Sequence, residues 1–470
     1  MRPGAAIPDS ARQDLERLLG VDRFLTAGVD REAYAWDNTG HRVLPDAVAL
    51  VTTEDEVCGV LRLCQAYRIP VTPRGAGTGN VGGCLAVFGG VVLSTQQMNR
   101  ILEVSVADRY AVVEAGVVNG DLQKRLGDED LFWPPDPSSA RSCTVGGNIA
   151  MCSAGPGAVR WGVARDWVLG LEAVLMNGEK IRTGGRTTKG VVGFDMTRLL
   201  IGSEGTLAVV TRAILKLASK PEKRYLSRIS FASVELAASA VSRLLSARQI
   251  PSAIEFLDGS ALDLLRRETS VPIAVEARAM LLLEVAGAAL GLKEQVEVML
   301  ESIKNFQPLE WTQPVEGAEA ARVWEARSAL SPILKRLAPK RINEDVVVPV
   351  SRLPLLMDGL EKISRASGIP IVSFGHAGNG NIHVNLLVDP QNATIMALVG
   401  GVLDRVFRLV LDLDGSLSGE HGVGTQKRDY IAWELDKNCL NLQKEIKRIF
   451  DPMGLLNPGK IWPLTEVQQG

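Results

Sequence analysis

The sequence predicts an α+β protein of two or three domains, and three observations lead to this prediction. Its 470 residues exceed what one compact core ordinarily holds. Residues 47–72 have the pattern of strand, helix and strand, and they run into a glycine-rich loop. Beyond a charged, proline-containing segment at residues 220–224, strands and helices alternate in longer units to about residue 415. We interpret residues 220–224 as a linker between the two parts.

The first part begins with a short amphipathic helix at residues 10–20. Residues 47–53 then predict a strand, and residues 54–67 predict a helix with one apolar face. A second strand at residues 69–72 leads into the glycine loop at residues 73–83. The order is therefore strand, helix, strand and loop.

Short runs of β-forming residues follow this loop, at residues 90–94, 101–104 and 110–115. A second glycine-rich region covers residues 136–162, and a third at residues 200–210 closes the first part. Three glycine-rich segments in one part of a chain indicate repeated close approach of the backbone to a ligand or to itself.

The later part contains one long apolar window, Met280–Leu292, which we interpret as a buried strand and a turn. The tail is expected to form a helix from residue 444, followed by a turn-rich segment. The predicted domains are residues 1–219, residues 220–415, and a C-terminal segment at residues 416–470 that returns to the first domain.

Composition excludes several classes of protein. The formal net charge of −2 carries no basic field for nucleic acid or an anionic membrane. The N-terminus lacks the apolar core of a signal peptide, and Met280–Leu292 is too short to span a bilayer. We expect a cytoplasmic protein without a transmembrane segment, which a partner could hold at a membrane.

The six cysteines do not form a metal-binding pattern, because no two are spaced as Cys-x-x-Cys. This spacing argues against an iron–sulfur cluster or a structural zinc site. We expect buried thiols in a reducing compartment. The cysteines are Cys58, Cys64, Cys84, Cys143, Cys152 and Cys439.

Three of the four histidines fall in two glycine-rich segments near the C-terminus, at residues 374–385 and 418–424. Imidazole is the commonest metal ligand and the usual acid–base group near neutral pH. We therefore expect the chemistry to take place at these segments. His41 stands apart from the other three and is expected to be a surface or core histidine.

The first glycine loop contains Gly77-Thr78-Gly79-Asn80-Val81-Gly82, which matches the G-x-G-x-x-G pattern of nicotinamide-binding domains. Such a loop must open a helix, and the residues after Gly82 do not predict one. A Walker loop fails too, because no Gly-Lys-Ser/Thr follows. The alternatives left open are a loop whose backbone N–H groups cradle a diphosphate, or a surface turn.

Four segments of the first part resemble the FAD domain of the vanillyl-alcohol-oxidase type. Residues 73–79 resemble its diphosphate loop, and residues 135–148 its second flavin segment. Residues 160–166 and 201–206 resemble the third and fourth. The resemblance implies a two-subdomain FAD-binding domain followed by an α+β substrate (cap) domain with an antiparallel sheet and a C-terminal helical segment.

The same resemblance implies noncovalent FAD, because the first loop holds no histidine for a covalent link. Cys143 is expected to be an ordinary thiol. The implied FAD-binding residues are Pro73, Arg74, Gly75, Ala76, Gly77, Thr78, Gly79, Asn80, Pro137, Ser138, Thr144, Gly146, Gly147, Asn148, Gly162, Asp166, Ile201, Glu204, Gly205, Val209 and Asn457.

The C-terminal segments narrow the resemblance to the FAD-linked D-2-hydroxyacid dehydrogenases. The matching residues are Gly375-His376-x-Gly-x-Gly-Asn381-x-His383, Ser418-Gly-Glu420-His421-Gly and Asn457-Pro-Gly-Lys460. The family includes D-lactate dehydrogenase, the catalytic glycolate oxidase subunit and D-2-hydroxyglutarate dehydrogenase. Together the motifs cover residues 40–463 in family order.

This family implies a divalent metal held by His376, His383 and Glu420, with His421 as the general base for the substrate hydroxyl. The mixed nitrogen and oxygen set suits zinc, manganese or iron. Asn385 alternates with His383 along a predicted strand and so lies on the same face. We expect Asn385 near the reacting oxygens.

Arg327, in Trp324-Glu325-Ala326-Arg327, resembles the family's carboxylate-binding arginine. Some relatives carry a second cation, a lysine, where this chain has Asn343. Lys340 and Arg341 are candidates to compensate. The departure favours a small substrate, D-lactate or glycolate, over a dicarboxylate such as D-2-hydroxyglutarate.

Reduced FAD must pass electrons to a separate acceptor, because this chain has no cluster-binding cysteines. An electron-transferring flavoprotein, an iron–sulfur subunit, a quinone and direct reaction with oxygen all stay open. The rival hypotheses are a nicotinamide dehydrogenase, a metal-dependent hydrolase and a non-catalytic FAD-binding partner subunit.

Overall fold

The computed structural model describes residues 7–269, 271–337 and 339–464. The chain divides into two compact units. Unit 1 consists of Met1–Ala154, Val163–Lys220 and Glu420–Gly470, and unit 2 consists of Gly155–Gly162 and Pro221–Gly419. Unit 2 therefore consists of two segments that interrupt the three segments of unit 1.

Unit 1 starts with a small sheet of β1 (Phe24–Leu25), β2 (Ala47–Leu50), β3 (Val71–Arg74) and β4 (Val91–Ser94), in the order β1-β2-β4-β3. Strands β2, β4 and β3 are parallel, and β1 is antiparallel to β2. Helices α1 (Asp9–Leu19) and α3 (Glu54–Ala66) share an apolar core with it. The Thr53 side chain caps α3 by accepting a hydrogen bond from the Glu56 N–H.

The C-terminal segment completes this sheet. The Val71 N–H donates to Leu455 O at 2.8 Å, and the Asn457 N–H donates to Val71 O at 2.7 Å. Strand β3 begins at Val71, two residues later than the predicted start at residue 69. The Ile69 N–H instead donates to Cys64 O at 2.7 Å and closes the end of α3.

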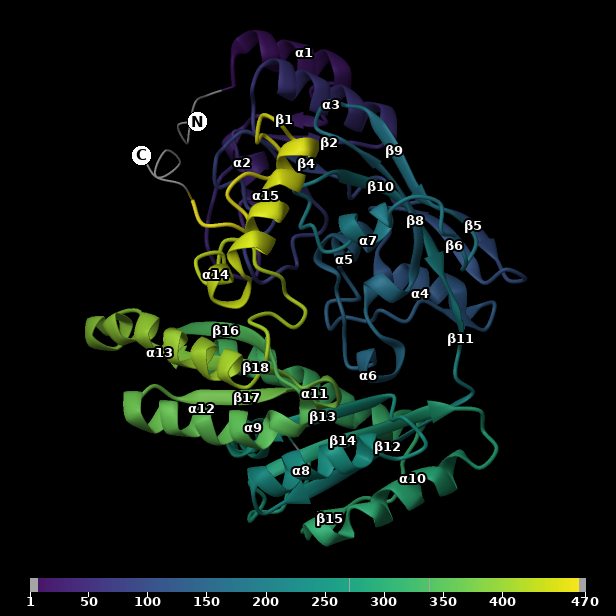
Figure 1. The fold of residues 1–470 in the computed structure, drawn as a ribbon, viewed down its shortest axis with the longest axis vertical. Coiled ribbons are helices and arrows are strands. Elements are labelled where there is room, and N and C mark those ends of the chain that lie inside the picture. Colours follow the sequence, from purple (N-terminus) through teal and green to yellow (C-terminus); the bar gives the residue numbers. More distant parts are fainter. Residues whose placement is uncertain (1–6, 270, 338, 465–470) are drawn as a thin grey trace. The chain divides into compact units, whose positions relative to one another are not determined.

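A second, antiparallel sheet of unit 1 has the order β5-β6-β10-β8-β9. Helices α4 and α5 and the turn before β10 contribute to its core (Figure 1). The elements are β5 (Ile101–Ser105), β6 (Tyr110–Glu114), β8 (Val168–Val174), β9 (Lys180–Gly184), β10 (Val209–Lys216), α4 (Asn119–Gly127), α5 (Val145–Met151) and α7 (Met196–Leu200). The short strands β7 (Leu131–Phe132) and β11 (Ala218–Ser219) pair separately.

The C-terminal helix α15 (Lys437–Phe450) begins seven residues before the predicted start at residue 444. The Asp436 side chain sets this start, because it accepts hydrogen bonds from the N–H groups of Asn438 and Cys439. Ile446 and Phe450 then pack against the core of the five-stranded sheet. The helix that precedes α15 is α14 (Ile431–Glu434).

Unit 2 is built on one antiparallel sheet in the order β15-β12-β14-β13-β17-β18-β16. Its members are β12 (Lys223–Phe231), β13 (Ala253–Asp258), β14 (Ala279–Gly287), β15 (Glu310–Trp311), β16 (Lys340–Val347), β17 (Ile371–His376) and β18 (Asn381–Val388). Residues 220–224 were predicted to be a linker, but Lys223 already pairs with Gly287 in the first strand. The apolar window Met280–Leu292 forms β14 and a turn, as predicted.

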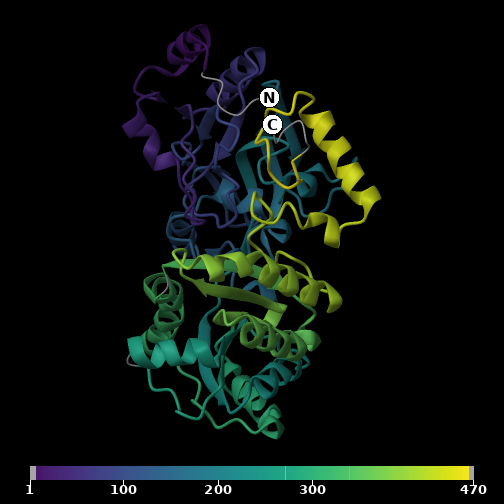
Figure 2. The same ribbon diagram turned by 90° about the vertical axis from the view of Figure 1, so that its left-hand side faces the viewer.

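Helices pack on this sheet in two groups. Leucines of α9 and α11 join the apolar core formed with Leu257 and Phe374. Helix α12 packs between α8 and α13, and Figures 1 and 2 show the three helices along the sheet. The helices of unit 2 are α6 (Ala158–Trp161), α8 (Val234–Leu245), α9 (Gly259–Glu268), α10 (Leu292–Ser302), α11 (Gly317–Leu337), α12 (Leu353–Ser367) and α13 (Ala393–Asp412).

Two further expectations are tested by the fold. The cysteines were all expected to be buried, but Cys84, Cys152 and Cys439 are half-exposed, and only Cys58, Cys64 and Cys143 are buried. Among the described residues, no helix is both long and apolar enough to cross a bilayer.

Candidate functional site

The first glycine loop of unit 1 presents a row of free backbone donors. Within the part of the chain that the structure describes, the N–H groups of residues 75–81 have no hydrogen-bond acceptor. The residues are half-exposed for most of this length, and no helix follows them. Consecutive free N–H groups of this kind bind phosphate oxygens. The loop therefore has the chemistry of a diphosphate cradle and not of a closed surface turn.

Asp37 and Asn38, which were not predicted as site residues, form hydrogen bonds with this loop. Asp37 Oδ2 accepts a hydrogen bond from the Gly82 N–H at 2.8 Å. Asn38 Nδ2 donates to Thr78 O at 2.8 Å, and its backbone N–H donates to Gly79 O at 2.9 Å. The carbonyls of the loop are thereby engaged while its N–H groups stay available. The polar run Asp37-Asn38-Thr39-Gly40 was the signal for such a turn.

The Arg74 side chain packs against the first glycine loop at Gly77. Its Nη1 donates to Cys84 Sγ at 3.0 Å and its Nη2 donates to Trp36 O at 2.9 Å. A Cβ at Gly77 would lie 2.1 Å from Arg74 Nη2, and Gly77 also has a φ of +72°. Glycine is favoured here by the left-handed backbone conformation, and a Cβ would in addition displace the Arg74 guanidinium.

The second predicted flavin segment lies against the first loop. A Cβ at Gly75 would lie 2.3 Å from Thr144 Oγ1. The N–H groups of Gly146 and Gly147 donate to Ala115 O and to Thr144 Oγ1, respectively. These two amides therefore stabilise helix α5, and a different atom of the segment is available to a ligand.

That atom is Asn148 Nδ2, which is buried and has no oxygen or nitrogen acceptor among the described residues. The nearby Cys143 thiol is at most a weak acceptor. An unmatched buried donor costs free energy unless a ligand satisfies it. Asn148 thus fits a bound cofactor better than it fits an empty interior.

The other predicted cofactor residues lie in several surroundings. Gly205, with a φ of +66°, packs against Pro73, and Ile201 and Val209 are buried. Asp166 Oδ2 accepts from the Val163 N–H at 3.0 Å, so it stabilises its own turn. Three residues are placed without a contact that favours a ligand, namely Pro137, Ser138 and Gly162, and Gly162 belongs to unit 2.

Asn457 links two glycine segments of unit 1. Its Nδ2 donates to Gly83 O at 3.0 Å and to Glu204 O at 2.7 Å. Its Oδ1 accepts from Lys460 Nζ at 3.1 Å, and Lys460 also donates to Leu85 O. Burial lowers the pKa of Lys460 to about 8. The Asn-Pro-Gly-Lys motif therefore stabilises the backbone that directly follows the first glycine loop.

In unit 2, His376 lies at the end of β17 beside a buried acid. Its Nδ1 contacts Glu255 Oε1, and Arg327 donates from Nε and Nη2 to Glu255 Oε2 at 2.7 and 2.6 Å. Burial alone would raise the pKa of Glu255, but His376 and Arg327 outweigh it and lower the pKa to about 2. The Arg327 guanidinium also lies 4.6 Å from the centroid of the Phe374 ring.

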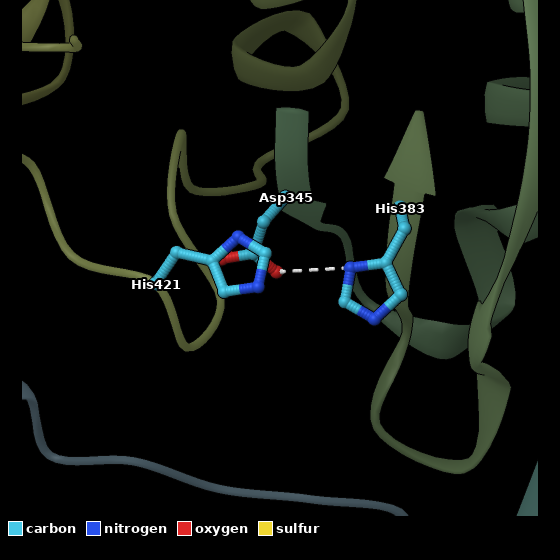
Figure 3. A group of neighbouring side chains, drawn as sticks. All are labelled: Asp345, His383 and His421. Atoms are coloured by element: carbon cyan, nitrogen blue, oxygen red, sulfur yellow. Dashed lines mark ion pairs between the residues drawn. The ribbon is translucent and has the colours of Figure 1, made fainter. Parts of the chain in front are cut away.

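His383 has a similar acidic neighbour, because β16 and β18 pair in a register that sets it opposite Asp345. His383 Nδ1 lies 3.9 Å from Asp345 Oδ1, the ion pair drawn in Figure 3. Asp345 also accepts hydrogen bonds from Asn381 Nδ2 at 2.6 Å and from the Gly419 N–H at 2.9 Å. His376 and His383 offer ligand nitrogens within 4.8 Å of one another.

Glu255 and Asp345 were not among the predicted site residues. A carboxylate inside the apolar run Ala253–Leu257 was a signal for Glu255, and the strand that ends at Pro349 was one for Asp345. Carboxylates behind histidine ligands orient the rings and raise their basicity. The two buried histidines therefore have the surroundings of metal ligands.

Asn385 lies two residues beyond His383 and is fully buried. Its Nδ2 donates to Val372 O at 3.0 Å and to His383 O at 3.1 Å. Its Oδ1 has no partner among the described residues, and the same holds for Oδ1 of Asn343, which faces Asn385 across the strand pair. Both oxygens can accept a hydrogen bond from a ligand.

Glu420 and His421 follow Gly419 directly in the chain, and the Gly419 N–H is bound to Asp345. His421 Nε2 lies 3.9 Å from Glu420 Oε1 and 3.1 Å from Asn80 Nδ2. The predicted base thus contacts a residue of the predicted diphosphate loop. His41 is exposed, as a histidine without a role in the site would be.

Two solved structures share the fold of this chain. p-Cresol methylhydroxylase matches with a TM-score of 0.79 at 17% identity, over 98% of each chain. 4-Ethylphenol oxidase from Gulosibacter chungangensis matches with a TM-score of 0.75 at 19% identity, over 98% of this chain and 99% of that one. The predicted fold class is confirmed.

Family models and relatives then identify the group. Residues 45–184 match the FAD binding domain, and residues 220–461 match the FAD linked oxidases, C-terminal domain. The chain belongs to the FAD-linked oxidase family that contains D-lactate dehydrogenases and glycolate oxidase subunits, as the sequence motifs predicted, and it is an FAD-dependent oxidoreductase.

Two relatives show how far the likeness extends. The glycolate oxidase subunit GlcD of Bacillus subtilis is 36% identical over 97% of both chains. A probable mitochondrial D-lactate dehydrogenase of Danio rerio is 33% identical over 93% of this chain and 88% of its own. The residues of unit 1 fit FAD through the free N–H groups of residues 75–81 and through Asn148.

Proposed function

We propose that this chain oxidises a small D-2-hydroxy acid, with D-lactate preferred and glycolate next, to the corresponding 2-oxo acid. The observation that carries the proposal is the pair of buried histidines, His376 and His383, each beside a buried acid in an FAD-linked oxidase. FAD, when bound, supplies the acceptor for the hydride from the substrate α-carbon.

We further propose that His376, His383 and Glu420 hold a divalent metal. Three protein ligands leave the open position that a catalytic metal needs. When bound, such a metal would lower the pKa of the substrate hydroxyl. Support comes from the Glu255 and Asp345 carboxylates, each of which lies at the Nδ1 side of one histidine. Glu420 is one peptide bond from Gly419, whose N–H is bound to Asp345.

His421 is proposed as the group that removes the hydroxyl proton. Asn80 beside its Nε2 holds the ring in one orientation. Because the Asn80 Nδ2 group donates to Nε2, the neutral ring carries its hydrogen on Nδ1, and Nε2 is the basic nitrogen that would take up the proton. Such a hydrogen bond sets the tautomer of the imidazole.

Arg327 and Asn385 are proposed to bind the substrate carboxylate and hydroxyl. Glu255 engages Nε and Nη2 of Arg327, which leaves Nη1 for a carboxylate oxygen. The unpartnered Oδ1 of Asn385 accepts from a hydroxyl or from a metal-bound water. The buried acid beside Arg327 disfavours a second negative charge there, which supports a substrate with a single carboxylate.

A second candidate substrate class is a D-2-hydroxy dicarboxylate such as D-2-hydroxyglutarate. Arg341 favours it, because burial lowers the pKa of Arg341 and no described carboxylate pairs with it. Arg341 lies four residues from Asp345 on β16, so the two residues share one face of the sheet. A distal carboxylate could neutralise this guanidinium.

Electrons are proposed to leave reduced FAD for a separate acceptor, either an electron-transferring flavoprotein, an iron–sulfur subunit or a quinone. The relative from Bacillus subtilis is named a subunit, which supports a partner protein. A role as a non-catalytic partner subunit is the alternative.

The test is anaerobic reduction of the purified, FAD-loaded protein by a panel of D- and L-2-hydroxy acids. We expect D-lactate to bleach the visible flavin band and L-lactate to leave it. Bleaching by D-2-hydroxyglutarate alone would move the assignment to the second candidate. A flavin band that no 2-hydroxy acid bleaches would reject the proposal.

A pair of variants separates the catalytic from the non-catalytic role. His421→Ala should lose turnover by about 10²-fold or more while the FAD content is unchanged. His41→Ala is the matched control, because this exposed histidine lies outside the site. Equal turnover of the two variants would favour the partner-subunit alternative.

A further inference from the structure

Glu204 belongs to the third glycine-rich region and forms hydrogen bonds with three other segments, those of Ala150, Asn457 and residues 423–424. It is 6% exposed and has a φ of +53°, which is rare for a residue with a side chain. Its backbone N–H donates to Ala150 O at 2.8 Å, and its carbonyl accepts from Asn457 Nδ2 at 2.7 Å. The main chain is therefore held from both sides in a strained conformation, so the carboxylate direction is set.

The carboxylate of Glu204 binds the backbone that follows His421. Oε1 accepts from the Val423 N–H at 2.7 Å, and Oε2 accepts from the Gly424 N–H at 2.8 Å. Burial raises the pKa of Glu204, and these two N–H groups act against that shift. Both oxygens are thus engaged by the protein, although the sequence resemblance implied a cofactor contact for this residue.

Gly422 permits this close approach. Its φ is +84°, and a Cβ there would lie 2.8 Å from Glu204 Oε1. On the other side of the loop, Val81 O accepts hydrogen bonds from the Thr425 N–H at 2.8 Å and from Thr425 Oγ1 at 3.2 Å. The four residues after His421 are therefore fixed to Glu204 and to the diphosphate loop.

We propose that Glu204 is a positioning residue for Glu420 and His421. By fixing the N–H groups of Val423 and Gly424, it sets the direction in which the two side chains leave the main chain. This inference rests on the proposed function for the roles of Glu420 and His421, but not for the hydrogen bonds themselves. Glu204 would act through the loop and need not touch the substrate.

Glu204→Gln tests the inference, because the amide keeps the volume and directs one NH₂ group at a backbone N–H. Asp451→Asn is the matched control. The Asp451 carboxylate is also buried in unit 1 and accepts from two consecutive N–H groups, those of Leu455 at 3.1 Å and Leu456 at 2.7 Å. The Asp451 carboxylate also pairs with Lys447, so the control removes at least as much interaction, and only Glu204→Gln acts on the backbone beside His421.

The first measurement is amide hydrogen exchange by mass spectrometry, which does not depend on turnover. Glu204→Gln should speed exchange in the peptide that covers residues 420–425 by at least tenfold, and Asp451→Asn should leave that peptide unchanged. If exchange in this peptide were unaltered in Glu204→Gln, the inference would be overturned, whether or not the proposed substrate is correct.

The second measurement is kcat per bound flavin, with KM and the flavin absorption spectrum. Glu204→Gln should lower kcat by about 10²-fold, as a displacement of about 1 Å can do, with flavin content and KM nearly unchanged. Asp451→Asn should lose stability and keep kcat. An equal loss of kcat in both variants would overturn the inference, because it would show a general effect of stability.

Glu204→Asp covers the case in which Glu204→Gln does not fold. The shorter acid keeps its charge and can keep one of the two hydrogen bonds. It should give a kcat between those of the wild type and the deepest loss, with exchange of residues 420–425 raised less. A kcat and an exchange rate equal to those of the wild type would count against positioning by Glu204.

Discussion

At the scale of single residues, two buried acids lie beside the histidines of the proposed site. Glu255 touches His376 and Asp345 faces His383, and both acids are fully buried. Buried carboxylates are costly unless they are paired. Here Arg327 and backbone or amide N–H groups supply the partners. Glu255 is therefore in direct contact with the His376 ring, whereas Asp345 lies 3.9 Å from His383 Nδ1.

Asp345→Asn should weaken metal binding by about 10–100-fold, since the neutral amide no longer supports the His383 ring electrostatically. Titration of the metal-free protein with Mn²⁺ or Zn²⁺ by calorimetry measures the change. Asp358→Asn is a suitable control, because among the described residues the ion-pair partner of this acid is the exposed Lys362 on α12. Equal affinities of the two variants would contradict the role given to Asp345.

Asp258 predicts a pH dependence of stability. Its Oδ1 caps α9 at the Ala261 N–H, and burial raises its pKa from 3.8 to about 7. The folded state therefore binds more protons than the unfolded state between these values, so this group's contribution is full below about pH 4 and is lost as the pH rises to about 7. Asp258→Asn should flatten this part of the profile in urea unfolding at several pH values. An unchanged slope would contradict the prediction.

The histidines could be proposed from the sequence because imidazole is rare in this chain and its chemistry is distinctive, whereas Glu420 was proposed only through the family resemblance. Glu255 and Asp345 could not be assigned in the same way. Each is an acid on a mostly apolar strand, and its partner comes from strand register across the sheet. Pattern within one segment carries no information about the residue opposite it.

At the scale of elements, the β17–β18 hairpin carries the two histidines of the proposed metal site that belong to unit 2. Its turn depends on Gly380, which has a φ of +73° and where a Cβ would lie 1.8 Å from Val348 O. The Val348 N–H also donates to Gly380 O at 3.1 Å. The position of the hairpin therefore depends on a residue that has no side chain.

Gly380→Ala should destabilise the protein by at least about 2 kcal/mol, because the left-handed backbone and the contact with Val348 both oppose a Cβ. Gly400→Ala gives the matched control on α13, where a Cβ meets nothing within 4 Å. That change should stabilise by about 0.8–1 kcal/mol, the difference in helix propensity. Urea unfolding measures both, and equal effects would contradict the reasoning.

Elements with a clear period were predictable, whereas helix α5 was not. The segment Val145–Met151 contains two glycines and looked like part of a loop. Its first turn is held by the Thr144 cap and by hydrogen bonds from Val145 and Gly146 to Val117 O and Ala115 O. Tertiary contacts therefore override a poor intrinsic propensity, which no local pattern reveals.

At the scale of the whole molecule, each of the two units is built around apolar cores of its own. The order of the chain does not reveal this division fully, since the short segment Gly155–Gly162 belongs to unit 2. That segment lies inside a glycine-rich run with no change in composition. Only packing, such as the contact between Val159 and Gly378, assigns it.

Because the free N–H groups of residues 75–81 belong to unit 1, FAD should stabilise unit 1 by mass action. Adding FAD to deflavinated protein at about 100 times its Kd should contribute about 2.7 kcal/mol. Scanning calorimetry should show a rise in the transition that carries unit 1, identified by exchange protection of residues 75–81. The absence of both the rise and the protection would contradict the assignment of the cradle.

The pairing of Val71 with Leu455 and Asn457 has a consequence for biosynthesis. Strand β3 emerges from the ribosome early, but its outer neighbour is translated only after all of unit 2. A nascent chain must therefore keep an unfinished sheet edge soluble for most of its synthesis. Chaperone dependence in the cell should then follow the delay before residues 455–457 arrive, and cofactor loading should come after translation of nearly the whole polypeptide.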